Sequence, residues 1–158
     1  MKRAIELHAN GKLLITGEYL VLVGAKALAM PVRFGQRMLL QETPERTIDW
    51  VSFAGDVAWF SVRFDPDTLK IIVSDKKTIA GKLMKVLKAA RRINPAFLTG
   101  PAGWKVRVTA NYPLEWGLGS SSSLYFLVAS WAGIPVYDLY RQVSQGSGYD
   151  IACAGRSG

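Results

Sequence analysis

The most informative stretch of the chain is Pro113-Leu114-Glu115-Trp116-Gly117-Leu118-Gly119-Ser120-Ser121-Ser122-Ser123, in which a glycine-rich turn leads into four consecutive serines. Apolar residues at helical spacing follow it, namely Leu124, Leu127, Val128 and Trp131. Gly133 and Pro135 then supply a helix stop. The stretch therefore predicts a helix that begins at the serines.

Two interpretations fit this turn equally well. In the first it is a phosphate cradle, because Gly117 and Gly119 let the backbone approach an anion while the first-turn N–H groups and the helix dipole favour negative charge. In the second it is a serine-rich helix cap after an ordinary loop, since serine is a preferred cap and glycine a common turn residue. The stretch alone does not separate them.

The composition predicts one folded domain with a real core, because the chain has 158 residues and 49% of them are hydrophobic. No apolar run reaches the roughly 18 residues that cross a bilayer. The first residues also lack a signal-peptide core. We therefore expect a cytoplasmic protein without a membrane partner. The single cysteine, Cys153, cannot form an internal disulfide, and we expect it to be a small buried hydrophobe.

The charge balance favours anionic partners, because 20 Lys and Arg residues against 12 Asp and Glu give a net charge of +8. Much of the excess lies within residues 76–92, where Ile79, Leu83, Leu87 and Ala90 fall at helical spacing. We expect an amphipathic helix whose cations are solvated. An RNA-binding face is less favoured, because no aromatic residues alternate with these cations to stack bases.

The rest of the chain predicts mostly strands. We expect strands at 4–9 and 12–22 joined by a tight Asn10-Gly11 turn, and an extended segment at 27–42 with a bend or bulge near Pro31 and Gly35. Further strands are expected at 47–53, 57–64, 69–73 and 104–109, a short helix at 136–143, and the start of a strand at 151–154. This order predicts an α+β fold in two layers.

Three motifs together resemble the amino-terminal domain of the GHMP kinases, the superfamily of galactokinase, homoserine kinase, mevalonate kinase and phosphomevalonate kinase. The first is the segment 10–19 with Gly24-Ala25 and Ala27-Leu28-Ala29 behind it. The second is Pro113 followed by Gly117-Leu118-Gly119-Ser120-Ser121, and the third is Gly146-Ser147-Gly148-Tyr149-Asp150-Ile151-Ala152. The wording Gly-Tyr-Asp-Ile-Ala is similar to that of a bacterial subgroup.

The resemblance implies a two-layer fold like domain 2 of ribosomal protein S5, with an active site shared with a following ferredoxin-like domain. It also implies ATP and Mg²⁺ as cofactors. The nucleotide phosphates would be held by Gly117, Leu118, Gly119, Ser120, Ser121 and Ser122, with the hydroxyl of Ser120 or Ser121 near Mg²⁺. The resemblance favours the cradle interpretation.

Four further residues receive roles from the resemblance. Asp150 would take the proton of the acceptor and Lys12 would neutralise developing charge, and a pair between them would explain a lysine in an apolar strand. Glu18 is either a substrate contact or merely a strand end. Asp138 is the nearest candidate for a second metal-binding carboxylate, since Leu139 and Tyr140 occupy the neighbourhood of the family's glutamate.

The resemblance covers residues 1–158 as one nucleotide-binding domain but includes no carboxy-terminal domain with its glycine-rich third motif. We therefore expect exposed apolar surface and self-association. The leading function is the ATP- and substrate-binding domain of a small-molecule kinase that phosphorylates a hydroxyl or phosphate acceptor, with a mevalonate-like compound as a guess. The alternatives are a nucleotide-binding domain without catalysis and a basic RNA-binding module.

Overall fold

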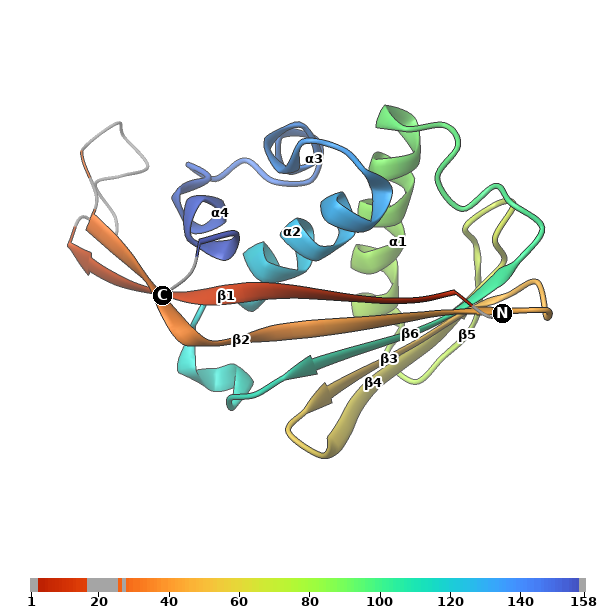
Figure 1. The fold of residues 1–158 in the computed structure, drawn as a ribbon, viewed down its shortest axis with the longest axis horizontal. Helices are drawn as coiled ribbons and strands as arrows, with labels where there is room; N and C mark the ends of the chain where they lie inside the picture. The colour runs from red at the N-terminus through yellow and green to blue at the C-terminus, as the bar shows by residue number, and fades with distance from the viewer. Residues whose placement is uncertain (1–2, 17–25, 27, 157–158) are drawn as a thin grey trace.

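A computed structural model describes residues 3–16, 26 and 28–156. It contains a six-stranded sheet in the order β1-β2-β6-β3-β4-β5, with the four α-helices gathered on one face (Figure 1). The strands are β1 (Ala4–Thr16), β2 (Leu28–Thr43), β3 (Ile48–Ala54), β4 (Val57–Phe64), β5 (Ile71–Ser74) and β6 (Gly103–Ala110). The helices are α1 (Lys77–Ile93), the 3₁₀ helix η2 (Leu114–Trp116), α2 (Ser120–Ala132), α3 (Val136–Val143) and α4 (Tyr149–Ala154). The predicted two-layer α+β fold is confirmed.

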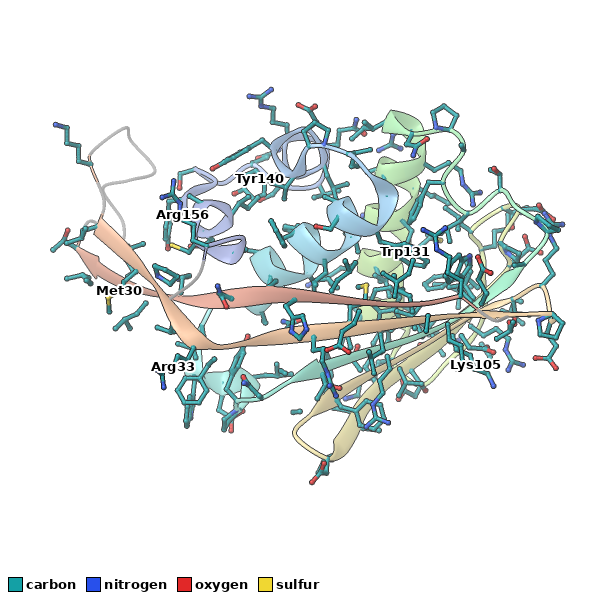
Figure 2. All side chains as sticks on the ribbon, in the orientation of Figure 1. Met30, Arg33, Lys105, Trp131, Tyr140 and Arg156 are labelled. Carbon is teal, nitrogen blue, oxygen red and sulfur yellow. The ribbon has the colours of Figure 1, made fainter. Side chains whose placement is uncertain are left out.

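The sheet is amphipathic, as the alternation of the sequence predicts. In β6, Val106 and Val108 are buried under the helices, while Lys105 and Arg107 are exposed. Figure 2 shows Lys105 projecting from the face that the helices leave open. Neighbouring strands pair antiparallel except β3 and β6, which are parallel. One face of the sheet therefore builds the core.

Helices α1 and α2 close the core from one side. Leu87 of α1 and Leu127 of α2 are fully buried with Trp50 and Phe64 of the sheet in one apolar cluster. The expected amphipathic helix is confirmed, because the apolar side of α1 is buried and its lysines lie largely toward solvent. Among the cations of this helix Arg91 is the exception, since its guanidinium is half-buried and donates hydrogen bonds to the carbonyl oxygens of Pro66 and Phe97. Within the described residues, no helix is long and apolar enough to cross a membrane.

The expected hairpin turn at Asn10-Gly11 is wrong, because β1 runs through it without reversing. Asn10 pairs with Gly35 but Lys12 pairs with Pro31, so the strands bulge between these positions, and the irregularity predicted near Pro31 and Gly35 is confirmed. A Cβ atom on Gly11 would lie 2.9 Å from the carbonyl oxygen of Leu118. The glycine therefore permits close contact between strand and loop rather than a turn. Residues 17–22 of the expected strand lie outside the described residues.

Two other expectations are corrected. Residues 151–154 belong to helix α4, not to a strand, because Gly148 adopts a left-handed conformation with φ 77° and begins a helical turn. That turn buries Ile151 and Ala154. The strand expected at 69–73 begins only at Ile71, because Leu69 turns inward with φ 54° and is buried.

The ends of β1 and β2 extend beyond α4 (Figure 1). Large apolar side chains are exposed there, namely Leu13, Ile15, Leu28 and Met30, and Figure 2 shows Met30 on this extension. Exposed apolar surface of this kind favours association. Self-association stays a prediction.

Candidate functional site

The turn before α2 has the geometry of an anion site. Gly117 and Gly119 are both left-handed, with φ 67° and 79°. Gly119 occupies the cap position of α2, so no side chain caps the helix. Among the residues that the structure describes, the amide groups of 118–122 have no hydrogen-bond acceptor. These amides and the helix dipole create a positive cradle, defined here as residues 117–122.

Strand β1 fixes the cradle from below. The backbone N–H of Lys12 donates a hydrogen bond of 2.9 Å to the carbonyl oxygen of Leu118. The buried hydroxyl of Ser123 shares its proton between the carbonyl oxygens of Asn10 and Gly119, both at 3.1 Å. The bulge of β1 and the start of α2 therefore hold each other in place.

The side chain of Lys12 crosses the cradle. A Cβ atom on Gly119 would lie 3.1 Å from Cγ of Lys12, so a larger residue there would displace the lysine. The ammonium nitrogen ends 3.5 Å from Oδ1 of Asp150 and 3.4 Å from the hydroxyl of Tyr149. The predicted pair between Lys12 and Asp150 is confirmed. The pair therefore brings the motif around Lys12 and the motif around Asp150 together beside the cradle.

The contacts between Lys12, Asp150 and Tyr149 shift the pKa values of Lys12 and Tyr149. Burial lowers the pKa of Lys12, but Asp150 and then Tyr149 more than offset this, so the pKa lies above its ordinary value. Burial, with a smaller contribution from Asp150, raises the pKa of Tyr149. Near neutral pH the site therefore holds an ammonium group beside a neutral phenol.

Asp150 sits in the first turn of α4, against the first turn of α2. Its Oδ2 accepts a hydrogen bond of 3.3 Å from the hydroxyl of Ser122. Its Oδ1 is buried and has no hydrogen-bond partner among the described atoms, with Lys12 only at ion-pair distance. A buried carboxylate oxygen left in this state is suited to accept a proton or hydrogen bond from a ligand.

The other predicted site residues are less closely grouped. Ser121 is exposed at the mouth of the cradle. Asp138 is on α3, where it pairs with Arg141 of the same helix at 3.7 Å, and within the described residues no hydrogen bond or ion pair joins it to the cradle. Glu18 lies outside the described residues. No group of three His, Cys, Asp or Glu side chains that could hold a metal occurs within residues 3–16, 26 and 28–156.

A cavity of about 470 Å³ opens next to the cradle, between the sheet and α1. Aromatic side chains line it, including Trp50, Trp59 and Phe60, and Ser120 and Ser121 form its end toward the cradle. Lys82 and Lys85 of α1 also line it. Sequence reasoning missed this cavity, because the same aromatic residues in strands equally predict ordinary core. It also missed the contacts of Tyr149 and Ser123.

Comparison with known proteins shows that solved kinase structures share the fold of this chain. No family model and no curated protein matches the sequence. The galactokinase of Lactococcus lactis in complex with galactose superposes with a TM-score of 0.66 at 16% identity, over 99% of this chain and 40% of that one. The mevalonate kinase of Methanococcus jannaschii gives a TM-score of 0.59 at 16% identity, over 96% and 51%. The fold is that of the amino-terminal half of a GHMP kinase.

A third GHMP kinase has the same fold, the D-glycero-D-manno-heptose 1-phosphate kinase of Bacteroides thetaiotaomicron. It gives a TM-score of 0.60 at 18% identity, over 98% of this chain and 53% of that one. The chain thus spans about half the length of the GHMP kinases that it matches, or less. The three neighbours act on different small molecules, so the shared fold leaves the acceptor open.

Proposed function

We propose that the chain forms the ATP-binding part of a small-molecule kinase of the GHMP type. The observation that carries this proposal is the cradle, whose amides at 118–122 lack acceptors among the described residues while Lys12 and Asp150 lie directly beside it. Phosphates bind well to a helix N-terminus that no side chain caps. The shared kinase fold supports the same assignment.

The nucleoside would occupy the neighbouring cavity. Its aromatic lining suits a flat base, and its end at Ser120 and Ser121 adjoins the cradle. Lys82 and Lys85 from α1 would sit near the polar parts of the nucleotide. The phosphates would then point along the cradle toward Lys12.

Magnesium fits this site as an ion carried by the phosphates. Mg²⁺ usually binds through one or two protein ligands together with phosphate oxygens and water, so it does not need a cluster of carboxylates. The exposed hydroxyl of Ser121 is the predicted protein ligand, and Asp138 stays a second candidate. When bound, Mg²⁺ would neutralise phosphate charge.

The chemistry proposed for the chain's own residues is proton transfer and charge neutralisation. The acceptor oxygen bonds to the γ-phosphorus as the bond to the leaving ADP oxygen breaks, and Oδ1 of Asp150 takes the acceptor's proton. Lys12, held beside both Asp150 and the cradle, balances the charge that develops on the oxygens. The proposed acceptor is a hydroxyl or phosphate compound of the mevalonate type.

Calorimetric titration with Mg·ATP tests the proposal. We expect the wild-type chain to bind and Gly119→Asp to lose binding, because the new carboxylate repels phosphate and displaces Lys12. Gly100→Asp is the matched control, since it adds the same charge at an exposed glycine with open space around it.

Ser121→Asp provides a second variant that avoids the left-handed position. An acidic residue in the first turn stabilises a helix, so this variant should fold. It should nevertheless weaken Mg·ATP binding by about tenfold or more, because its charge lies at the mouth of the cradle. Equal affinity in wild type, Gly119→Asp and Ser121→Asp would reject the cradle as the nucleotide site.

A nucleotide-binding domain without catalysis is one alternative, and a basic RNA-binding module is the less favoured one. The noncatalytic domain would bind Mg·ATP but would not transfer its phosphoryl group to any hydroxyl acceptor. Transfer that Asp150→Asn abolishes would exclude it.

A further inference from the structure

Tyr149 touches Lys12 in two ways. Its hydroxyl lies 3.4 Å from Nζ of Lys12, and Nζ lies 5.3 Å from the centroid of its ring. An ammonium group is attracted both to a neutral hydroxyl oxygen and to the face of an aromatic ring. Tyr149 and Asp150, consecutive at the start of α4, thus hold Lys12 together.

The position of Tyr149 is set by the glycine-rich segment before it. Gly148 is left-handed, and its N–H donates a hydrogen bond of 3.2 Å to the hydroxyl of Tyr140. A Cβ atom on Gly146 would lie only 2.3 Å from the same hydroxyl oxygen. Figure 2 shows Tyr140 between α3 and α4. The segment therefore packs on Tyr140, and this packing directs Tyr149 toward Lys12.

A fixed lysine suits a phosphate site. The ammonium group has three N–H donors, of which one faces Tyr149 and one faces Asp150. The third remains for a ligand, and the aliphatic part of the side chain already lies across Gly119. A lysine that is ordered before binding loses less side-chain entropy when a ligand arrives.

We propose that Tyr149 is a positioning residue, which holds the ammonium group of Lys12 beside the cradle through its hydroxyl and its ring. The inference rests on the proposed function, because the ligand that the third N–H would contact is a phosphate group of Mg·ATP. It adds a residue that acts through Lys12 and does not itself touch the reacting atoms.

Two variants separate the two contacts. Tyr149→Phe keeps the ring and removes the hydroxyl, whereas Tyr149→Leu removes both. Tyr137→Phe is the matched control, because the hydroxyl of this exposed tyrosine forms no hydrogen bond with the residues that the structure describes. Thermal melts by circular dichroism show whether each variant is folded, and Tyr149→Phe alone suffices if Tyr149→Leu is not.

The first readout needs no nucleotide. Acetylation of Lys12 by acetic anhydride at pH 8, quantified by mass spectrometry, measures the fraction of neutral amine. The Tyr149 hydroxyl helps to raise the pKa of Lys12, so removing it should lower that pKa and raise the acetylation rate about threefold. The second readout is the affinity for Mg·ATP, which should fall about threefold in Tyr149→Phe and about tenfold in Tyr149→Leu. Tyr137→Phe should change neither.

The outcomes distinguish this inference from the function on which it rests. If the wild type binds Mg·ATP but both Tyr149 variants keep the wild-type acetylation rate and affinity, the positioning role is overturned and the proposed function stands. If Tyr149→Phe raises the acetylation rate but the wild type does not bind Mg·ATP, the contact with Lys12 is supported and the proposed function is contradicted.

Discussion

Two regions of this molecule are positive, and they differ in how their charge is held. Helix α1 carries exposed lysines, which keep their water and their rotamer freedom. The cradle at residues 117–122 carries no cationic side chain of its own, but its amides are fixed by two left-handed glycines and by bonds from β1. The difference teaches that net charge attracts an anion, whereas fixed donors determine where it binds.

The largest expected effect is on catalysis beside the cradle. Asp150→Asn should lower phosphoryl transfer by roughly 10²- to 10⁴-fold, because the amide cannot take the acceptor's proton. Transfer from labelled Mg·ATP to galactose, mevalonate and a heptose phosphate measures it. Asp56→Asn, in the exposed turn between β3 and β4, is the control. A transfer rate unchanged in Asp150→Asn would remove this residue from the mechanism.

The next effect concerns how firmly the cradle is held. Ser123→Ala removes a fully buried hydroxyl that bonds the carbonyl oxygens of Asn10 and Gly119. It should lower the free energy of unfolding by about 1–3 kcal/mol. Ser130→Ala, on the exposed side of the same helix, should be nearly neutral. Urea unfolding of both variants measures the difference, and equal midpoints would show that Ser123 does not support the cradle.

A smaller effect is expected from the cations of α1. Lys82→Gln with Lys85→Gln should weaken Mg·ATP binding only a few-fold at low salt, and the difference should disappear near 1 M salt, where the screening length is only about 3 Å. Calorimetry at two salt concentrations checks this. A larger loss that persists at high salt would make these lysines direct ligands rather than part of the general field.

The smallest effect is on stability at high pH. Lys12 has a raised pKa, so its ion pair stabilises the folded state fully below the unfolded-state value of about 10.4 and loses this contribution as the pH rises through the folded-state value. The free energy of unfolding should therefore fall above about pH 10.4, and less steeply in Asp150→Asn. Urea midpoints at pH 8 and pH 11 measure the slope. Identical slopes would mean that the pair contributes nothing.

The glycine turn and the helix start at Ser120 were predictable from the sequence because their signal is local, whereas the choice of a phosphate cradle over a serine cap depended on the resemblance. Glycines before a serine-started helix specify the left-handed turn and the uncapped helix start within a few residues. The amphipathic helix α1 and the strands β3 and β4 were predictable for the same reason, since their periodicity is contained within each segment.

What the sequence did not reveal depends on contacts between distant segments. The sequence Asn10-Gly11 is typical of a hairpin turn, and only the approach of Leu118 to Gly11 shows that the strand continues. The apolar run 151–154 fits a strand or a helix, and packing against α2 and β1 decides for the helix. Likewise, the aromatic cavity needs β3, β4 and α1 to be placed before it exists.

The most direct test of the central claim is a two-dimensional amide NMR titration of the ¹⁵N-labelled chain with Mg·ATP. We predict that the largest shifts occur at the backbone amides of residues 117–122, with smaller shifts along the exposed side of α1. Shifts confined to α1, with the amides of 117–122 unchanged at saturating nucleotide, would contradict the account.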